Sequence, residues 1–131
     1  MPKSVLIDSS IWINYFSSQD ESLCAGVEGL IRTDQAVISG LILGEVLYGA
    51  KSRIEYESLA DTFEGIRCLV DSPEVFSLAA GYAWQLREKG IKAPLADLTI
   101  AAHCVLGGIG LLTRDRHFSM IEEGLAVQLR V

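Results

Sequence analysis

Four carboxylates are the residues of this sequence best suited to chemistry, because each stands in otherwise apolar surroundings. They are Asp8, Glu45, Asp97 and Asp115. If the fold brings them together, they form a pocket with several negative charges and few cations. Like charges at close range raise one another's pKa values, and a divalent cation removes that repulsion. Ligands that offer only oxygen atoms suit Mg²⁺ or Mn²⁺ rather than zinc, so the four acids predict a site for one of these metals.

A site of this kind is well suited to phosphoryl chemistry. It holds one or two cations, roughly 3.5–4 Å apart when paired, which activate water and stabilise an in-line displacement. A phosphodiester brings further negative charge, which the cations and nearby Arg or Lys side chains accept. Arg114 and Arg116 flank Asp115 and are candidates for such contacts, although solvation at the surface explains them equally well.

Three of the four acids also have a purely structural explanation. Asp8 is followed by two serines, and all three are good N-cap residues for a helix. Asp97 falls in the first turn of a predicted helix, where a carboxylate complements the helix dipole. Asp115 is equally suited to cap a short helical turn. His103, in the same apolar stretch as Asp97, is expected to be a packed core or interface residue rather than a ligand.

Glu45 is harder to explain structurally, because it is the only charge in the apolar stretch 41–50. The residues one turn away on its own helix face are all uncharged: Leu41, Ile42, Tyr48 and Gly49. A surface Glu usually has polar neighbours on its face, and an unpaired buried carboxylate is costly. We therefore expect Glu45 to need a partner, a proton or a metal. An exposed position at a helix edge is the alternative.

Short apolar runs predict the strands that position these acids. The predicted strands cover residues 5–7, 36–38, 68–70, 109–112 and 125–131. Helical patterns separate them: 11–16, 21–31, 41–50, 55–65, 73–89 and 95–106. This alternation predicts an α/β fold, a three-layer sandwich with a central parallel sheet of about five strands. Asp8 and Asp115 then lie at the carboxyl edge of the sheet, where open α/β sheets bind ligands.

Length and composition restrict the function classes. A chain of 131 residues predicts one domain, 1–131, and no apolar run approaches the ~18 residues of a membrane span. The N-terminus lacks a signal-peptide pattern, so the cytoplasm is the expected compartment. Cys24, Cys68 and Cys104 are too far apart in the sequence for a zinc motif and are expected to be buried, reduced thiols. A net charge of −6 argues against non-specific binding to a phosphate backbone but agrees with an acidic metal site.

The motifs around these acids resemble the PIN domain family. The quoted residues are Asp8-Ser9-Ser10 after the first predicted strand, Glu45 with Gly49 one turn later, Asp97 opening a helix, and Thr113-x-Asp115-x-x-Phe118 after the fourth predicted strand. Their order and spacing, rather than any single motif, are specific, and the resemblance covers nearly the whole chain. VapC-type toxins of prokaryotic toxin–antitoxin pairs are the more similar branch, and all four of their acidic positions are filled here.

The resemblance implies a single PIN-like nuclease domain over residues 1–131. It implies an endoribonuclease that depends on Mg²⁺, or on Mn²⁺ as a substitute, and that cuts single-stranded or loop RNA. By the same resemblance Asp8, Asp97 and Asp115 are metal ligands, while Glu45 binds the metal directly or through water and orients the nucleophile. Thr113 and one of the serines after Asp8 would support them.

The resemblance also implies protein partners. It predicts a homodimer and inhibition by a cognate antitoxin, which packs a segment into an apolar groove and often presents a basic residue to the acidic site. The apolar stretches 12–16 and 41–47 are the candidate walls of that groove. The high apolar content, 50% of the residues, agrees with surface that a partner covers.

Three other readings begin from similar residues. A haloacid-dehalogenase-like phosphatase needs a second Asp two residues after the first, where this chain has Ser10. A receiver domain needs an early acidic pair and a late Lys besides an acid such as Asp71, and both are missing. A non-catalytic module of PIN fold, which binds RNA or sequesters antitoxin in a metal-dependent way, stays open as the alternative to an enzyme.

Overall fold

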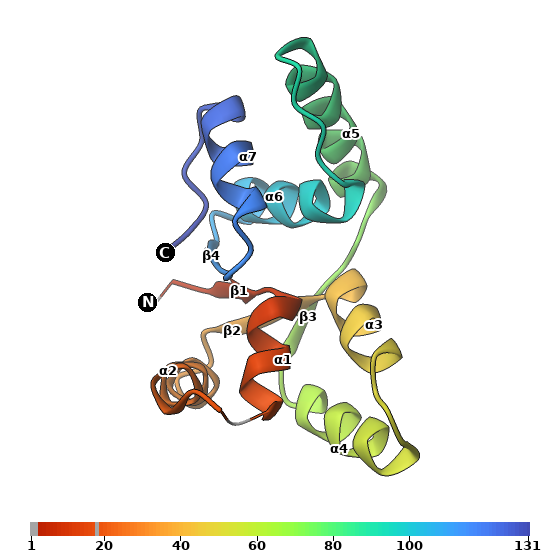
Figure 1. Ribbon diagram of the computed structural model, residues 1–131, viewed down its shortest axis with the longest axis vertical. Coiled ribbons are helices and arrows are strands. Elements are labelled where there is room, and N and C mark those ends of the chain that lie inside the picture. The colour runs from red at the N-terminus through yellow and green to blue at the C-terminus, as the bar shows by residue number, and fades with distance from the viewer. Residues whose placement is uncertain (1–2, 18) are drawn as a thin grey trace.

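A four-stranded parallel sheet forms the centre of the molecule, as the computed structural model of residues 3–17 and 19–131 describes it (Figure 1). Its strand order is β3-β2-β1-β4. The strands are β1 (Val5–Ile7), β2 (Ala36–Ser39), β3 (Arg67–Leu69) and β4 (Gly110–Leu112). Leu6 pairs with Val37 on one side and with Leu111 on the other. The predicted α/β class with a parallel sheet is confirmed.

Helices cover both faces of the sheet, which makes three layers. They are α1 (Ser9–Ser17), α2 (Glu21–Arg32), α3 (Gly40–Tyr48), α4 (Arg53–Glu64), α5 (Pro73–Glu88), α6 (Leu95–Gly107) and α7 (His117–Leu125). Figure 1 shows α1 to α4 on one side of the strands and α5 to α7 on the other. The described residues contain no helix long and apolar enough to cross a membrane.

The core is built from β1, β2 and β4 and from buried residues on each of the helices α1 to α7. All three residues of β1 are buried, as expected for a central parallel strand. Trp12 on α1 is fully buried, and its indole N–H donates to the carbonyl oxygen of Ile7 at 3.0 Å. Phe118 on α7 is equally buried on the opposite side. These two aromatic residues hold in place the chain segments that follow β1 and β4.

The last predicted strand, 125–131, is the main difference from the sequence prediction. Helix α7 continues to Leu125, and the segment after it meets the sheet only through one parallel bridge between Leu111 and Arg130. The carboxylate of Glu122 accepts the backbone N–H groups of Leu129 and Arg130, at 2.8 and 3.1 Å. A side chain therefore satisfies donors that a longer strand pairing would use, and the sheet has four strands rather than about five.

The three cysteines are free thiols, but they are not all buried. Cys104 is buried in α6, Cys24 is half-buried, and Cys68 is exposed. The prediction of a buried thiol was wrong for Cys68 because β3 is an edge strand, paired only with β2 among the described strands.

Candidate metal centre

Asp8 lies directly after β1 and is held in one orientation by its neighbours. Only 5% of its surface is exposed. The backbone N–H of Ser9 donates to Oδ1 at 2.7 Å, and the hydroxyls of Ser10 and Thr113 donate to Oδ2 at 3.0 and 2.8 Å. Its carboxylate is therefore positioned by hydrogen bonds rather than by a paired cation.

Asp115 reaches the same place because β4 runs beside β1. Ile7 pairs with Leu112, so the residues that follow the two strands emerge side by side. Thr113 joins them, since its hydroxyl donates to Asp8 and accepts the backbone N–H of Asp115 at 2.9 Å. The structure thus brings together the two strand-end acids that the sequence singles out.

Asp97 approaches from the first turn of α6. Its side chain is 17% exposed, and its pKa is raised from 3.8 to about 6. Burial is the largest cause, followed by the negative charges of Asp115 and Asp8, with a smaller contribution from Glu45. The nearby His117 opposes the increase. The pKa of Asp97 therefore responds to every other acid of the predicted quartet, which places all four acids in one electrostatic cluster.

Glu45 completes the cluster from α3, but it is exposed. The expectation of a buried carboxylate was wrong, because the face of α3 that carries Glu45 turns outward, whereas Ile42 and Val46 turn inward. The pKa of Glu45 is nevertheless raised, by partial desolvation and by the charge of Asp8. Ser39 accepts the backbone N–H of Ile42 at 3.3 Å and so caps α3 directly after β2. Glu45 consequently lies at the open side of the cluster.

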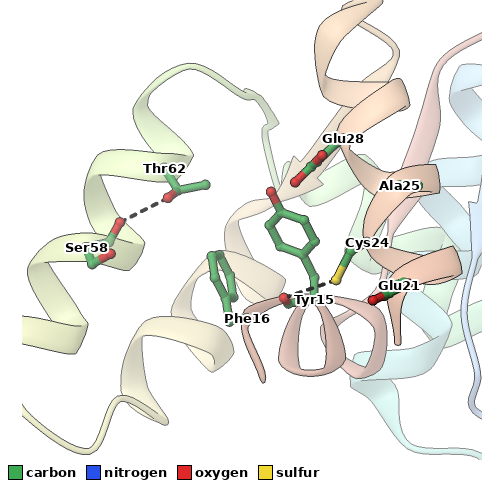
Figure 2. A pocket seen from close by; sticks show the side chains of 8 residues that line it. All are labelled: Tyr15, Phe16, Glu21, Cys24, Ala25, Glu28, Ser58 and Thr62. Atoms are coloured by element: carbon green, nitrogen blue, oxygen red, sulfur yellow. Dashed lines mark hydrogen bonds between the residues drawn. The ribbon is translucent and has the colours of Figure 1, made fainter. Parts of the chain in front are cut away.

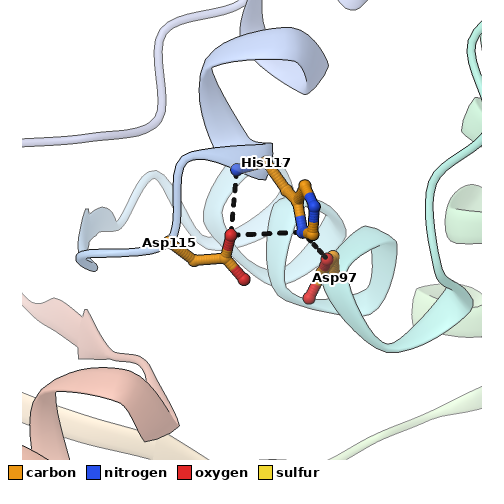
Figure 3. Close-up of side chains that lie close together, drawn as sticks. All are labelled: Asp97, Asp115 and His117. Atoms are coloured by element: carbon orange, nitrogen blue, oxygen red, sulfur yellow. Dashed lines mark hydrogen bonds and ion pairs between the residues drawn. The ribbon is translucent and has the colours of Figure 1, made fainter.

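His117 is a member of the site that sequence reasoning missed (Figure 3). Its Nδ1 atom lies 3.2 Å from Oδ1 of Asp115 and 4.0 Å from Oδ2 of Asp97. Its backbone N–H also donates to Oδ1 of Asp115, at 2.9 Å. One ligand atom from each of these three residues lies within 4.8 Å of the other two. The only sequence signal was its position inside the Thr113-x-Asp115-x-x-Phe118 motif.

The chemistry of these donors fits a hard divalent cation. Carboxylate oxygens dominate the cluster, and they are the ligands that Mg²⁺ and Mn²⁺ prefer. Burial raises the pKa values of Glu45 and Asp97, and the neighbouring carboxylates raise them further. His117 is the nearby basic group, and its side chain is 61% exposed. A bound cation would relieve repulsion that this exposed imidazole offsets only in part.

Of the two arginines beside Asp115, one already has a partner. A nitrogen of the Arg114 guanidinium lies 2.5 Å from Oδ2 of Asp20, which also caps α2 by accepting the backbone N–H of Leu23. Arg114 therefore joins the start of α2 to the segment after β4. Arg116 is exposed, and within the described part of the chain no ion pair involves it.

Two hollows lie on the side of the sheet that carries α1 to α4. One, of about 390 Å³, extends from Glu45 between α1, α3 and α4, and Ile13, Phe16, Val46 and Leu59 form its apolar lining. The other, of about 510 Å³, lies between α4 and the pair α1 and α2 (Figure 2). Phe16 lines both hollows. The stretches 12–16 and 41–47 were expected to form a groove. Ile13, Phe16 and Val46 from these stretches line the hollow beside Glu45, whereas Trp12 is buried.

Comparisons with known proteins agree with this architecture. The profile of the PIN domain family matches residues 5–124. Ribonuclease VapC11 of Mycobacterium tuberculosis (strain ATCC 25618 / H37Rv) is 30% identical over 121 residues, which is 89% of this chain and 90% of that protein. The VapC ribonuclease Mb1587 of Mycobacterium bovis has the same identity and coverage.

Several solved structures share the fold at lower sequence identity. VapBC2 from Rickettsia felis, bound to a promoter DNA fragment, superposes with a TM-score of 0.79 at 21% identity, covering 96% of each chain. DNA-bound VapBC from Salmonella typhimurium gives 0.78 at 19%, covering 98% of each chain. VapC20 of Mycobacterium tuberculosis, described as a toxin that cleaves the sarcin-ricin loop, gives 0.70 at 19%, also covering 98% of each chain.

Proposed function

This chain belongs to the PIN domain family and, within it, to the VapC branch, and on this premise we propose that it is an endoribonuclease toxin that requires Mg²⁺ or Mn²⁺. The observation that carries the proposal is the convergence of Asp97, Asp115 and His117, whose ligand atoms lie within 4.8 Å of one another. The pKa of Asp97 agrees with this, because burial and the charges of Asp115, Asp8 and Glu45 raise it to about 6. Four carboxylates that repel one another at a sheet edge are costly to a fold. They are useful when they hold a cation against a phosphodiester.

The four acids of the cluster would have different roles, which follow from their surroundings. Asp8 is held rigid by Ser9, Ser10 and Thr113 and would act as a fixed ligand. Asp97 and Asp115 would bind the cation from the other side. A divalent cation bound there supplies Lewis acidity toward the phosphoryl group and lowers the pKa of water. Glu45 lies at the exposed side, where its carboxylate would accept a hydrogen bond from the attacking water and orient it.

The substrate class we propose is single-stranded or loop RNA in the cytoplasm. The curated relatives are ribonucleases, and VapC20 is described as cleaving a loop. The acids are reached from the exposed side of Glu45, where an unpaired and flexible strand bends toward the cations more easily than a rigid duplex does. Arg116, exposed beside Asp115, is available to neutralise a flanking phosphate.

An antitoxin is the proposed regulatory partner. The neighbouring structures include VapBC assemblies, and VapBC is described as a family of toxin–antitoxin systems. The hollow beside Glu45 supports the same role here, because it joins apolar side chains such as Ile13 and Leu59 to the acidic site. An apolar antitoxin segment would fill it, and a basic residue at its end would occupy the acids in place of the metal.

We also propose that the chain forms a homodimer. Large apolar side chains lie open to solvent on both helical layers and at the sheet edge, and a second copy of the chain would cover part of this apolar surface. Tyr48 is 93% exposed, Val70 79% and Trp84 63%. Light scattering at micromolar concentration would test this directly, and a monomer there would contradict it.

The test of the activity is cleavage of total cellular RNA by the purified chain, with fragment ends mapped. We expect cleavage with Mg²⁺ or Mn²⁺ and none with EDTA. Asp8→Asn, Glu45→Gln and Asp97→Asn should each lose cleavage while keeping the wild-type circular dichroism spectrum. If wild type cleaves no RNA with either metal, the chain is instead a non-catalytic binding module. If these variants still cleave in a metal-dependent way, the acidic cluster is not the active site.

A further inference from the structure

Asp71 lies outside the acidic cluster, in the segment between β3 and α5, and its two carboxylate oxygens contact two different helices. Oδ1 lies 2.6 Å from Nε2 of His103, near the C-terminal end of α6. Oδ2 accepts the backbone N–H of Leu41 at 2.8 Å, at the start of α3. One side chain thus joins two helices from opposite layers of the sandwich (Figure 1).

This contact is built into the fold. His103 is only 6% exposed, and the Asp71 side chain is 18% exposed. The N–H of Leu41 belongs to the first turn of α3, where backbone donors lack helical partners and the helix dipole favours a carboxylate. A Cβ atom at Gly40 would lie 2.9 Å from Oδ2 of Asp71, so glycine at this position permits the close approach. The buried His103 therefore has a polar partner, as buried polar groups require.

The two helices that Asp71 joins carry two of the four acids. Leu41 precedes Glu45 by one turn of α3, about 6 Å along its axis, and His103 follows Asp97 by about 9 Å along α6. Helix α3 packs on α1 and α4, whereas α6 packs on α5. Each helix thus has its main packing partners within its own layer, and Asp71 contributes a direct polar link between them.

We infer that Asp71 is a positioning residue for the metal site. It fixes α3 relative to α6 and so sets the separation of the Glu45 and Asp97 carboxylates, without touching metal or substrate. The inference rests on the proposed function, because it presumes that these acids bind a divalent cation. Groups hydrogen-bonded directly to metal ligands typically account for about 10–100-fold in metal affinity or activity, and Asp71, which acts through two helices, is expected at the lower end of that range.

The direct test is calorimetric titration of the metal-free protein with Mn²⁺. Asp71→Ala removes both contacts, and we expect the Mn²⁺ dissociation constant to rise about tenfold. Asp71→Asn should restore affinity close to wild type, because its amide oxygen still accepts from Leu41 and its NH₂ group can donate to Nε2 of a neutral His103. Ser72→Ala is the matched control. It loses the cap of α5, whose hydroxyl accepts the N–H of Val75, and should melt earlier without weaker Mn²⁺ binding.

A second pair of variants tests the link without removing the carboxylate. Gly40→Ala forces Asp71 away from Leu41, whereas Gly44→Ala places its methyl group in open space on the same helix. Both raise the helix propensity of α3. We expect only Gly40→Ala to weaken Mn²⁺ binding, and this pair decides the question if Asp71→Ala fails to fold.

The Mn²⁺ titrations distinguish failure of the positioning role of Asp71 from failure of the proposed metal site. If wild type binds no Mn²⁺, the proposed metal site is wrong and the positioning role falls with it. If wild type binds Mn²⁺, but Gly40→Ala and any folded Asp71→Ala protein bind it as tightly, Asp71 is only a structural residue. The proposed function then stands.

Discussion

The hydroxyl of Thr113 donates a hydrogen bond of 2.8 Å to Oδ2 of Asp8, across the boundary between β4 and β1. The Thr113 hydroxyl oxygen also accepts the backbone N–H of Asp115 at 2.9 Å. Thr113 therefore uses its donor for one acid and its acceptor for the segment that carries another. One hydroxyl group thus links the two strand-end acids.

Thr113→Val keeps the shape of this residue and removes both hydrogen bonds. Because Asp8 is buried, losing one of its donors should lower the free energy of unfolding by about 1–3 kcal/mol. Affinity for Mn²⁺ should fall about tenfold, since Asp8 and Asp115 are no longer held together. Urea denaturation and calorimetric titration measure the two effects. Thr62→Val, which removes only an exposed hydrogen bond to the carbonyl of Ser58, is the control and should change neither quantity.

The sequence predicted the positions of Asp8 and Asp115 well, for a physical reason. An apolar run of three residues can be buried only as a strand or inside a helix, and in a parallel sheet the residues after neighbouring strands meet at one edge. Glu45 and Asp97 stood out in the sequence because an isolated acid in an apolar helix is unusual, and in the structure the charge of Glu45 contributes to the raised pKa of Asp97. The exposure of Glu45 was not predictable, since α3 is apolar nearly all round and its sequence does not show which face turns outward.

Other features depend on contacts that no local pattern encodes. Asp71 and His103 are 32 residues apart in the sequence and meet only in the folded chain. His117 is exposed on a short helix, so neither burial nor periodicity marked it. The C-terminal alternation was real, with Leu129 buried and Arg130 exposed, yet Glu122 takes backbone donors there that a longer strand would pair.

The pKa of Asp97 predicts how stability depends on pH without metal. Its pKa is 3.8 as a free side chain and about 6 in the fold, so the folded state binds the proton more tightly. Stability therefore falls as pH rises between these values and levels off above pH ~7, by about 3 kcal/mol if the whole shift is realised. Urea denaturation in EDTA at pH 5 and pH 8 samples the upper part of this range, where the free energy of unfolding should fall by about 1.4 kcal/mol. Saturating Mn²⁺ at pH 8 should restore the stability.

Asp97→Asn isolates this effect from other titrating groups. The variant lacks the charge that burial and the other acids oppose, so in EDTA at pH 8 it should be more stable than wild type. It should also show a smaller difference between pH 5 and pH 8 and little response to Mn²⁺. A variant less stable than wild type at pH 8 would mean that Asp97 is not repelled by its neighbours.

If the antitoxin occupies the hollow beside Glu45, a charge placed in that hollow should weaken antitoxin binding without unfolding the protein. Ile13 lines it and is 63% exposed, so Ile13→Asp places a charge on the apolar surface without disturbing the core. We expect the dissociation constant for the cognate antitoxin to rise by at least about tenfold, since burying an unpaired carboxylate is costly. Val105→Asp on α6, at a position that is 44% exposed in the opposite layer, should leave it unchanged. Equal affinities for both variants would place the antitoxin elsewhere.

His117 predicts which metals the site prefers. Its Nδ1 atom lies near Oδ1 of Asp115 and near Oδ2 of Asp97, so a cation bound by both carboxylates has an imidazole within reach. Nitrogen ligands strengthen binding of later transition metals such as Co²⁺, whereas Mg²⁺ relies on oxygen. His117→Ala should therefore weaken Co²⁺ binding about tenfold and Mg²⁺ binding much less. Arg116→Ala is the control, because it removes a neighbouring exposed cation that carries no metal-binding nitrogen. If His117→Ala changes the affinity for both metals equally, the imidazole acts on the acids only through its charge or packing and does not bind the metal.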